Sequence, residues 1–210
     1  MENKGKVLGF VGPMGGGKTY QLESAKTLSN IEGRIFITGD FSDGIRASVL
    51  KIFGVEGAVL EPSDENYLEW KRLNTRVSLP TNEMYLEEFS VCNRDLLKNV
   101  GEYFKKLAGA DVWARWTEND VRRKYYNLPE LEREKSNVAF GSIRFAVEAN
   151  VVFNIANITG KELKILFCNY NQTKFNSNVH ISESLAHQLI FKGYKHGDDV
   201  TEVIKEIYKL

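Results

Sequence analysis

The sequence has few cysteines, no long apolar run and no excess of either charge. Its 210 residues include two cysteines, Cys92 and Cys168, so neither a disulfide framework nor a cysteine zinc ribbon is indicated. No apolar stretch is long enough to cross a bilayer, and no secretory signal opens the chain. We therefore expect a cytoplasmic protein that has no membrane partner.

The charges of the chain balance. It carries 28 Lys and Arg residues against 28 Asp and Glu residues, which gives no electrostatic reason to expect a nucleic-acid partner. The basic run Arg122-Arg123-Lys124 is a local exception, and such runs are more often solvated helix surfaces than nucleic-acid contacts. The length and apolar content fit one substantial core. We expect a single domain over residues 1–210.

One glycine-rich segment, Gly12-Pro13-Met14-Gly15-Gly16-Gly17-Lys18-Thr19, matches the P-loop pattern G-x-x-x-x-G-K-[ST] at every position. The apolar run 7–11 precedes it and an amphipathic helical pattern follows. Glycine-rich backbone N–H groups and the positive end of the next helix together bind phosphate. In such loops the lysine reaches the β- and γ-phosphates and the threonine hydroxyl holds Mg2+. We expect ATP to contact Gly12, Met14, Gly15, Gly16, Gly17, Lys18, Thr19 and Tyr20, with Thr19 as the metal ligand.

Apolar strand candidates alternate with helical patterns along the rest of the chain. The strand candidates are residues 7–11, 34–38, 138–141 and 163–168, with a short last one at 189–191. Helices are expected after the P-loop and at about 45–53, 96–107, 112–126, 145–155 and 200–208, whereas 56–81 is expected to be irregular. This alternation predicts an α/β fold in three layers, a parallel sheet flanked by helices, with ligands beyond the carboxyl ends of the strands.

Several further segments resemble the bacteriophage deoxynucleoside monophosphate kinases, whose fold is that of the P-loop nucleoside monophosphate kinases. Residues 41–46 resemble the family's F-A-x-P-[LI]-K segment, and 94–102 resemble its R-x-L-L-Q-x-x-G-T helix. Residues 111–113 resemble its D-x-W, 143–148 match most of D-V-R-F-x-N-E, and 180–183 match H-x-S-E. The order and approximate spacing hold over nearly the whole chain.

The resemblance implies transfer of the γ-phosphate of ATP to a deoxynucleoside monophosphate (dNMP), with ATP and Mg2+ as cofactors and small nucleotides as partners. It also implies an infected bacterial cell as the setting, and a homodimer, because small kinases of this family are often dimers. Lys18 and Arg144 would be catalytic, and the chain would carry an acceptor-binding insert at about 42–110 and a lid-like segment at about 169–183. The acceptor-binding candidates are Asp40, Phe41, Arg46, Arg94, His180 and Glu183.

The residues leave other roles open for several of these candidates. Arg46 and Arg94 are equally well explained as ion-pairing arginines on solvated faces, and His180 as a hydrogen-bonded structural residue. Arg144 has the stronger functional case, because it follows a predicted strand end and can fork onto phosphate oxygens. No N-K-x-D motif favours a GTPase, and the histidines lack metal-ligand spacing.

The sequence departs from the family pattern near the reaction centre. Ser142 stands where the family has an aspartate, Val147 where it has an asparagine, and Lys174 is the lone cation of the lid-like segment. These changes remove charge, and they fit a different metal arrangement, low activity or binding without turnover. A non-catalytic nucleotide-binding protein and a kinase of another small phosphorylated metabolite therefore stay open. A cellular-type thymidine kinase is disfavoured, because two isolated cysteines cannot build its zinc ribbon.

Overall fold

The computed structural model describes residues 4–59, 65–80, 86–176 and 179–210. It divides into two compact units: unit 1 comprises Met1–Phe41 with Ala114–Leu210, and unit 2 comprises Ser42–Trp113. Unit 2 occupies nearly the same stretch as the insert expected at 42–110, whose acceptor-binding role stays a prediction. So does the single-domain organisation. Each unit has its own hydrophobic core.

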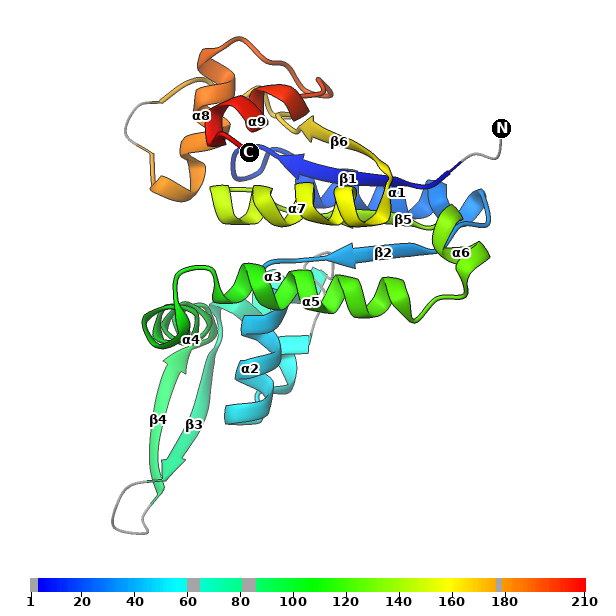
Figure 1. Ribbon diagram of the computed structural model, residues 1–210. Coiled ribbons are helices and arrows are strands. Elements are labelled where there is room, and N and C mark those ends of the chain that lie inside the picture. The colour runs from blue at the N-terminus through cyan, green and yellow to red at the C-terminus, as the bar shows by residue number, and fades with distance from the viewer. Residues whose placement is uncertain (1–3, 60–64, 81–85, 177–178) are drawn as a thin grey trace. The chain divides into compact units, whose positions relative to one another are not determined.

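Unit 1 is built on a parallel sheet (Figure 1). Its described strands follow the order β2-β5-β1-β6, with β1 paired to β5 on one side and to β6 on the other. The strands are β1 (Lys6–Val11), β2 (Phe36–Gly39), β5 (Asn137–Phe140) and β6 (Glu162–Phe167). The helical elements are α1 (Lys18–Ile31), α5 (Val112–Tyr126), α6 (Glu130–Lys135), α7 (Ala146–Thr159), η2 (Ile181–Glu183), α8 (Ser184–Phe191) and α9 (Thr201–Tyr208).

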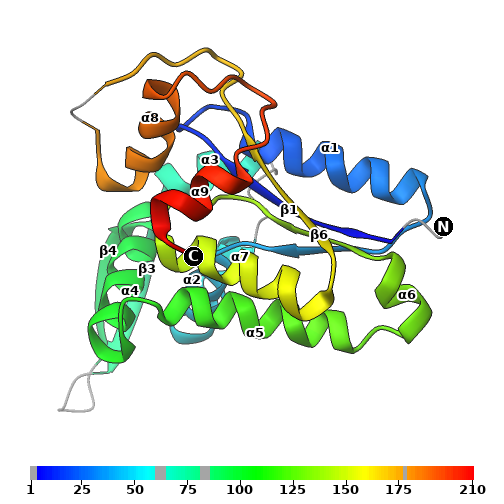
Figure 2. The same cartoon turned by 45° about the horizontal axis from the view of Figure 1, so that its top comes forward.

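Both faces of this sheet are buried, which explains the continuous apolar runs of its strands. Successive side chains point to opposite faces: Val7 and Val11 belong to the core shared with α5 and α7. Phe10 lies on the other face, in a smaller cluster with Leu22 of α1. Figure 2 shows α1 on one side of the sheet and α5 and α7 on the other. The predicted fold class is confirmed: unit 1 is a three-layer α/β fold, a parallel sheet flanked by helices, with the P-loop after its first strand.

The parallel strands of unit 1 all end at the same sheet edge. The segments that follow β1, β2, β5 and β6 therefore meet there. They carry the P-loop after Val11, Asp40 after β2, Arg144 after β5, and residues 168–171 after β6. The topology thus brings candidate site residues from four distant parts of the chain to one sheet edge.

The described part of unit 2 contains α-helices, a 3-10 turn and a pair of antiparallel strands around a separate core. The elements are α2 (Asp43–Phe53), η1 (Glu56–Val59), α3 (Glu65–Arg72), β3 (Asn74–Pro80), β4 (Leu86–Cys92) and α4 (Asn93–Ala108). β3 and β4 pair antiparallel, with Asn74 opposite Cys92. Val49 of α2 and Leu96 and Val100 of α4 form the buried centre of this core. The indole Nε1 of Trp113 donates to the carbonyl oxygen of Gly101 at 3.0 Å, tying the end of the unit to α4.

Two local predictions are wrong. Residues 189–191 are the last part of α8, because Leu185, Ala186 and Leu189 are buried at helical spacing. The stretch 56–81 contains η1, α3 and β3, although we expected it to be irregular. The other predicted strands and helices are confirmed, with boundary shifts of a few residues. Short apolar runs fit either period, so packing against neighbours decides between helix and strand.

Candidate functional site

The P-loop of unit 1 links β1 to α1 through a tight glycine turn. A side chain at Gly12 would bring its Cβ within 2.0 Å of the carbonyl oxygen of Cys168, so only glycine fits there. Gly17 caps α1 with a φ of 90°, a left-handed conformation that glycine adopts without strain. No side chain caps this helix, and its first turn has no acidic residue. The first N–H groups of α1 are therefore well placed to bind an anion.

Lys18 lies inside the loop and folds back over it. Its ammonium donates hydrogen bonds to the carbonyl oxygens of Gly12 at 2.6 Å and Pro13 at 2.8 Å. Burial lowers the pKa of Lys18, the charge of Glu183 opposes that change, and the charge of Arg144 adds to it. Lys18, Arg144 and Glu183 therefore share one electrostatic environment around the loop.

The segment after β6 contacts the outer side of the loop. The side-chain amide of Asn171 donates to the carbonyl oxygen of Gly15 at 2.9 Å. The backbone N–H of Tyr170 donates to the carbonyl oxygen of Gly16 at 3.1 Å. His196 accepts from the backbone N–H of Asn169 at 3.1 Å through Nδ1. From the sequence we expected residues 169–171 to belong to a lid-like segment. In the structure Tyr170 and Asn171 contact the P-loop, and His196 holds Asn169 beside them.

Glu183 and His180 lie on the short segment that leads into α8. The Oε2 atom of Glu183 accepts a hydrogen bond from the backbone N–H of Met14 at 2.7 Å, which places its carboxylate on the P-loop. His180 is exposed, and its Nδ1 lies 2.8 Å from the hydroxyl of Ser182 and accepts from the Ser182 N–H. The acceptor-binding role of both residues stays a prediction, and the structural role considered for His180 has a direct observation behind it.

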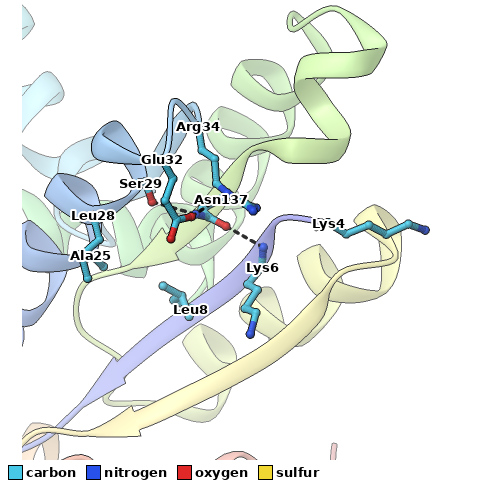
Figure 3. Close-up of a pocket in the computed structure, with 9 residues that line it drawn as sticks. All are labelled: Lys4, Lys6, Leu8, Ala25, Leu28, Ser29, Glu32, Arg34 and Asn137. Atoms are coloured by element: carbon cyan, nitrogen blue, oxygen red, sulfur yellow. Dashed lines mark hydrogen bonds and ion pairs between the residues drawn. The ribbon is translucent and has the colours of Figure 1, made fainter. Parts of the chain in front are cut away.

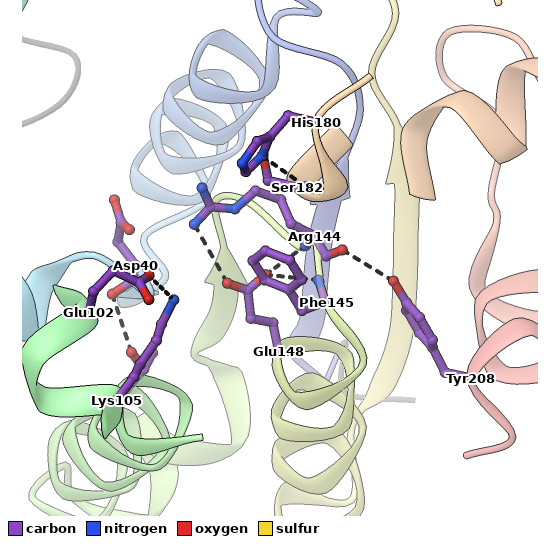
Figure 4. A network of polar contacts seen from close by, with 10 residues as sticks. Asp40, Glu102, Lys105, Arg144, Phe145, Glu148, His180, Ser182 and Tyr208 are labelled. Carbon is purple, nitrogen blue, oxygen red and sulfur yellow. Dashed lines mark hydrogen bonds and ion pairs between the residues drawn. The ribbon is translucent and has the colours of Figure 1, made fainter. Parts of the chain in front are cut away.

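Arg144 follows β5 and precedes α7, where Glu148 holds it (Figure 4). The Oε2 atom of Glu148 accepts from the backbone N–H groups of Arg144 at 2.6 Å and Phe145 at 3.2 Å. Its Oε1 atom lies 3.5 Å from the Arg144 guanidinium. The hydroxyl of Tyr208 donates to the carbonyl oxygen of Arg144 at 3.2 Å. The main chain and side chain of Arg144 are thus both fixed by neighbours within unit 1.

The carboxyl group of Glu148 is buried, with 5% of the residue exposed. Burial raises the pKa of Glu148, whereas the Arg144 charge and the two backbone N–H groups lower it, and the charge of Asp40 raises it further. Among the described residues, the Arg144 Nε atom is buried without a hydrogen-bond partner. The Arg144 side chain as a whole is 37% exposed, so its guanidinium can still donate to phosphate oxygens. Sequence reasoning gave Glu148 no role, and its place in the R-F-x-x-E segment was the available signal.

The remaining site candidates of unit 1 range from exposed to buried. Thr19 and Tyr20 are exposed on the first turn of α1. Asp40 is half-buried, and its carbonyl oxygen accepts from the hydroxyl of Thr117 at 3.3 Å. Phe41 is buried in the core, where its ring stacks on Phe140 with centroids 5.8 Å apart. Its expected contact with an acceptor stays a prediction, and its observed contacts are those of a core residue.

Unit 2 holds the two acceptor-side arginines. Arg46 of α2 is buried, forms an ion pair with Asp43 and lies 5.7 Å from the centroid of the Tyr67 ring. Arg94 is exposed on the first turn of α4. The ion pair of Arg46 fits the structural alternative that the sequence left open, but the residue is buried and does not lie on the solvated face expected in that alternative. Both acceptor roles stay predictions.

A shallow pocket of about 280 Å3 lies at the other edge of the sheet (Figure 3). It is lined by residues near the amino ends of β1 and β5, among them Lys6 and Asn137, and by Leu28 and Ser29 of α1. The Asn137 side chain accepts from the Lys6 N–H and donates to the Ser29 hydroxyl, both at 2.8 Å. These polar groups satisfy one another, and the pocket is not part of the P-loop site.

Further observations concern metal sites, membrane spans and the basic run of α5. Among the described residues, no three His, Cys, Asp or Glu side chains lie close enough to hold a metal ion by themselves. No helix in the same part of the chain combines the length and apolar character of a membrane span. The basic run at 122–124 forms ion pairs with Glu118 and Asp120 of the same helix at 2.6 to 2.7 Å.

Cys168 provides a direct test of the packing around the loop. The residue is buried, and burial raises the pKa of its thiol to about 11. Because the thiolate is the reactive form, we expect a maleimide at pH 8 to modify the half-exposed Cys92 much faster than Cys168. Mass spectrometry of peptides at timed intervals measures both rates. Equal rates in the folded protein would contradict the packing of Cys168 beneath the P-loop.

Neither a protein-family model nor a curated protein matches the sequence. Among solved structures, the chain is similar to a mutant of the Mycobacterium tuberculosis APS kinase CysC, with 14% sequence identity and a TM-score of 0.33. The alignment covers 90% of this chain and 96% of that chain. A likeness at this level carries no argument about activity or substrate. The parallel sheet of unit 1 and the P-loop between β1 and α1 support the α/β fold independently of this likeness.

Proposed function

We propose that the protein is a phosphotransferase of the bacteriophage deoxynucleoside monophosphate kinase type, which phosphorylates a dNMP at the expense of ATP. The observation that carries the proposal is the P-loop of unit 1, with the uncapped amino end of α1, Lys18 inside the loop and Arg144 in its electrostatic environment. Two cations around one anion-binding loop suit the transfer of a charged phosphoryl group.

In the proposed reaction an oxygen of the dNMP phosphate attacks the γ-phosphorus of ATP. The bond between that phosphorus and the oxygen shared with the β-phosphate breaks, which releases ADP and leaves a dNDP. No covalent bond to the protein is required, so catalysis consists of positioning and charge stabilisation. Lys18 would neutralise the β- and γ-phosphate oxygens. Arg144, held by Glu148, would donate to the transferred group or the acceptor phosphate.

The residues at the loop fit a magnesium ion that arrives with the nucleotide. Mg2+ prefers hard oxygen ligands and commonly binds through one or two protein groups, nucleotide phosphates and water. Thr19 offers a hydroxyl oxygen on the exposed first turn of α1. The ion would neutralise phosphate charge. Asp40, after β2, supplies an acidic side chain at the same sheet edge, whereas Ser142, after the strand β5 that lies between β2 and β1, supplies none.

An ADP-release assay with ATP, Mg2+ and each dNMP and NMP in turn tests the function. Under the proposal, release depends on one or a few dNMPs, and the product is the corresponding dNDP. Release with another phosphorylated metabolite alone would keep the transfer chemistry and replace the substrate class. ATP binding without release for any acceptor would indicate a non-catalytic nucleotide-binding protein, for which the absence of an aspartate at Ser142 offers a physical reason.

A further inference from the structure

The P-loop already holds an anion that belongs to the chain itself. The backbone N–H of Met14 donates to the carboxylate of Glu183 at 2.7 Å, across 169 residues of sequence. A charge-assisted hydrogen bond of this kind is about twice as strong as one between neutral groups. P-loop N–H groups are where phosphate oxygens bind, so Glu183 occupies the type of position that a ligand anion needs.

The main chain around Glu183 is well anchored. The Glu183 N–H donates to the carbonyl oxygen of His180 at 2.8 Å, and the imidazole of His180 accepts from the Ser182 N–H. The next residues begin α8, where Leu185 and Ala186 are buried in the core of unit 1. Release of the Met14 N–H therefore requires only a rotation of the Glu183 side chain, without movement of the segment that carries it.

The charge of Glu183 also acts on Lys18. The two groups are close enough for the carboxylate to oppose the effect of burial on the lysine ammonium. An incoming phosphate must therefore replace Glu183 at Met14 and tolerate its negative charge nearby. A ligand that contacts several loop N–H groups and brings a cation can offset this repulsion, whereas a small free anion cannot.

We propose that Glu183 is a specificity-determining residue of the phosphate site, because its carboxylate competes with ligand anions for the Met14 N–H. The residue thereby weakens the binding of free phosphates and favours a metal-complexed polyphosphate. This inference rests on the proposed function, since it assumes that the P-loop binds nucleotide phosphates. It differs from the acceptor-binding role expected from the sequence, because it places Glu183 on the donor side.

Calorimetric titration of Glu183→Gln against the wild-type chain tests the proposal. Glutamine keeps the length of the side chain and a neutral acceptor oxygen, but it removes the competing charge. We expect metal-free tripolyphosphate to bind Glu183→Gln about tenfold more tightly than wild type, with a smaller gain for MgATP. Glu183→Ala removes the acceptor entirely and is expected to change the affinity in the same direction. Glu130→Gln, an exposed residue of α6, makes the same charge change as a control and leaves the affinity unaltered.

The outcomes separate this inference from the proposed function. Equal tripolyphosphate affinities for wild type and Glu183→Gln would overturn the competition, while MgATP binding by both would leave the kinase proposal intact. Tighter tripolyphosphate binding by Glu183→Gln without any MgATP binding would support the competition and contradict the nucleotide site. The amide signal of Met14 in NMR spectra is a second measurement without ligand. It must shift upfield in Glu183→Gln, and an unchanged signal would also overturn the inference.

Discussion

Replacement of Lys18 by alanine is expected to abolish phosphoryl transfer and leave the fold intact. The ammonium of Lys18 lies within the loop, bonded to the carbonyl oxygens of Gly12 and Pro13, so it can turn to phosphate oxygens without a change in the backbone. Loss of this cation removes charge stabilisation where negative charge develops, and we expect turnover to fall by about 10³-fold. ADP release that depends on the added dNMP measures the loss of turnover, and far-UV circular dichroism measures the fold.

Lys192→Ala is the matched control, because Lys192 is an exposed lysine next to the end of α8. It should release ADP at the wild-type rate.

Burial lowers the pKa of Lys18, so the free protein loses this positive charge as pH rises through a value below the ordinary 10.5. Nucleotide affinity of the wild type should therefore fall with rising pH before an ordinary lysine titrates, and Lys18→Ala should lack that step. Unchanged turnover in Lys18→Ala would refute the mechanism.

Replacement of Arg144 by alanine is expected to lower turnover by about 10²- to 10³-fold, with a smaller change in KM. Glu148 and Tyr208 fix the position of Arg144, and its side chain is still 37% exposed. A guanidinium held in this way can donate to phosphate oxygens whose charge increases in the transition state. Steady-state kinetics with the acceptor identified by the ADP-release panel separate kcat from KM.

Two further variants distinguish this role from a structural one. Arg144→Lys keeps the charge but loses the planar fork, so it should recover only part of the lost turnover. Arg123→Ala removes an arginine whose side chain is 71% exposed and pairs with Asp120, and it should leave turnover unchanged. If Arg144→Ala lowered the melting temperature but kept the wild-type kcat, Arg144 would serve only to position α7 through its contact with Glu148.

Much of unit 1 could be predicted because its signals are local. The strands of the parallel sheet are mostly apolar, since both faces of the sheet are covered, and the P-loop lies between one of them and an amphipathic helix. The departures fall where local signals are ambiguous. The apolar triplet 189–191 fits a strand, but its neighbours Leu185 and Ala186 pack as one face of α8. The hairpin of β3 and β4 depends on pairing between distant residues, which no local period shows.

The features of the candidate site also divide into those that the sequence shows and those that only the structure shows. The P-loop, Lys18 and Thr19 were identified from sequence, because the chemistry of phosphate binding requires those residue types at that spacing. The contact of Glu183 with Met14 and that of Asn171 with Gly15 could not be identified, because each joins residues more than 150 positions apart. Their partners are backbone groups, which carry no side-chain signature in the sequence.

The sequence by itself determined the P-loop, the alternation of strands and helices, and the position of Arg144 after a strand. These features follow from local periodicity and from glycine, lysine and threonine at set intervals. Only the tertiary structure decided that the buried Glu148 holds Arg144 and that Glu183 lies on the P-loop. The reason is physical: parallel strands bring distant loops to one sheet edge, and the partner that each polar group finds there depends on packing of the whole unit.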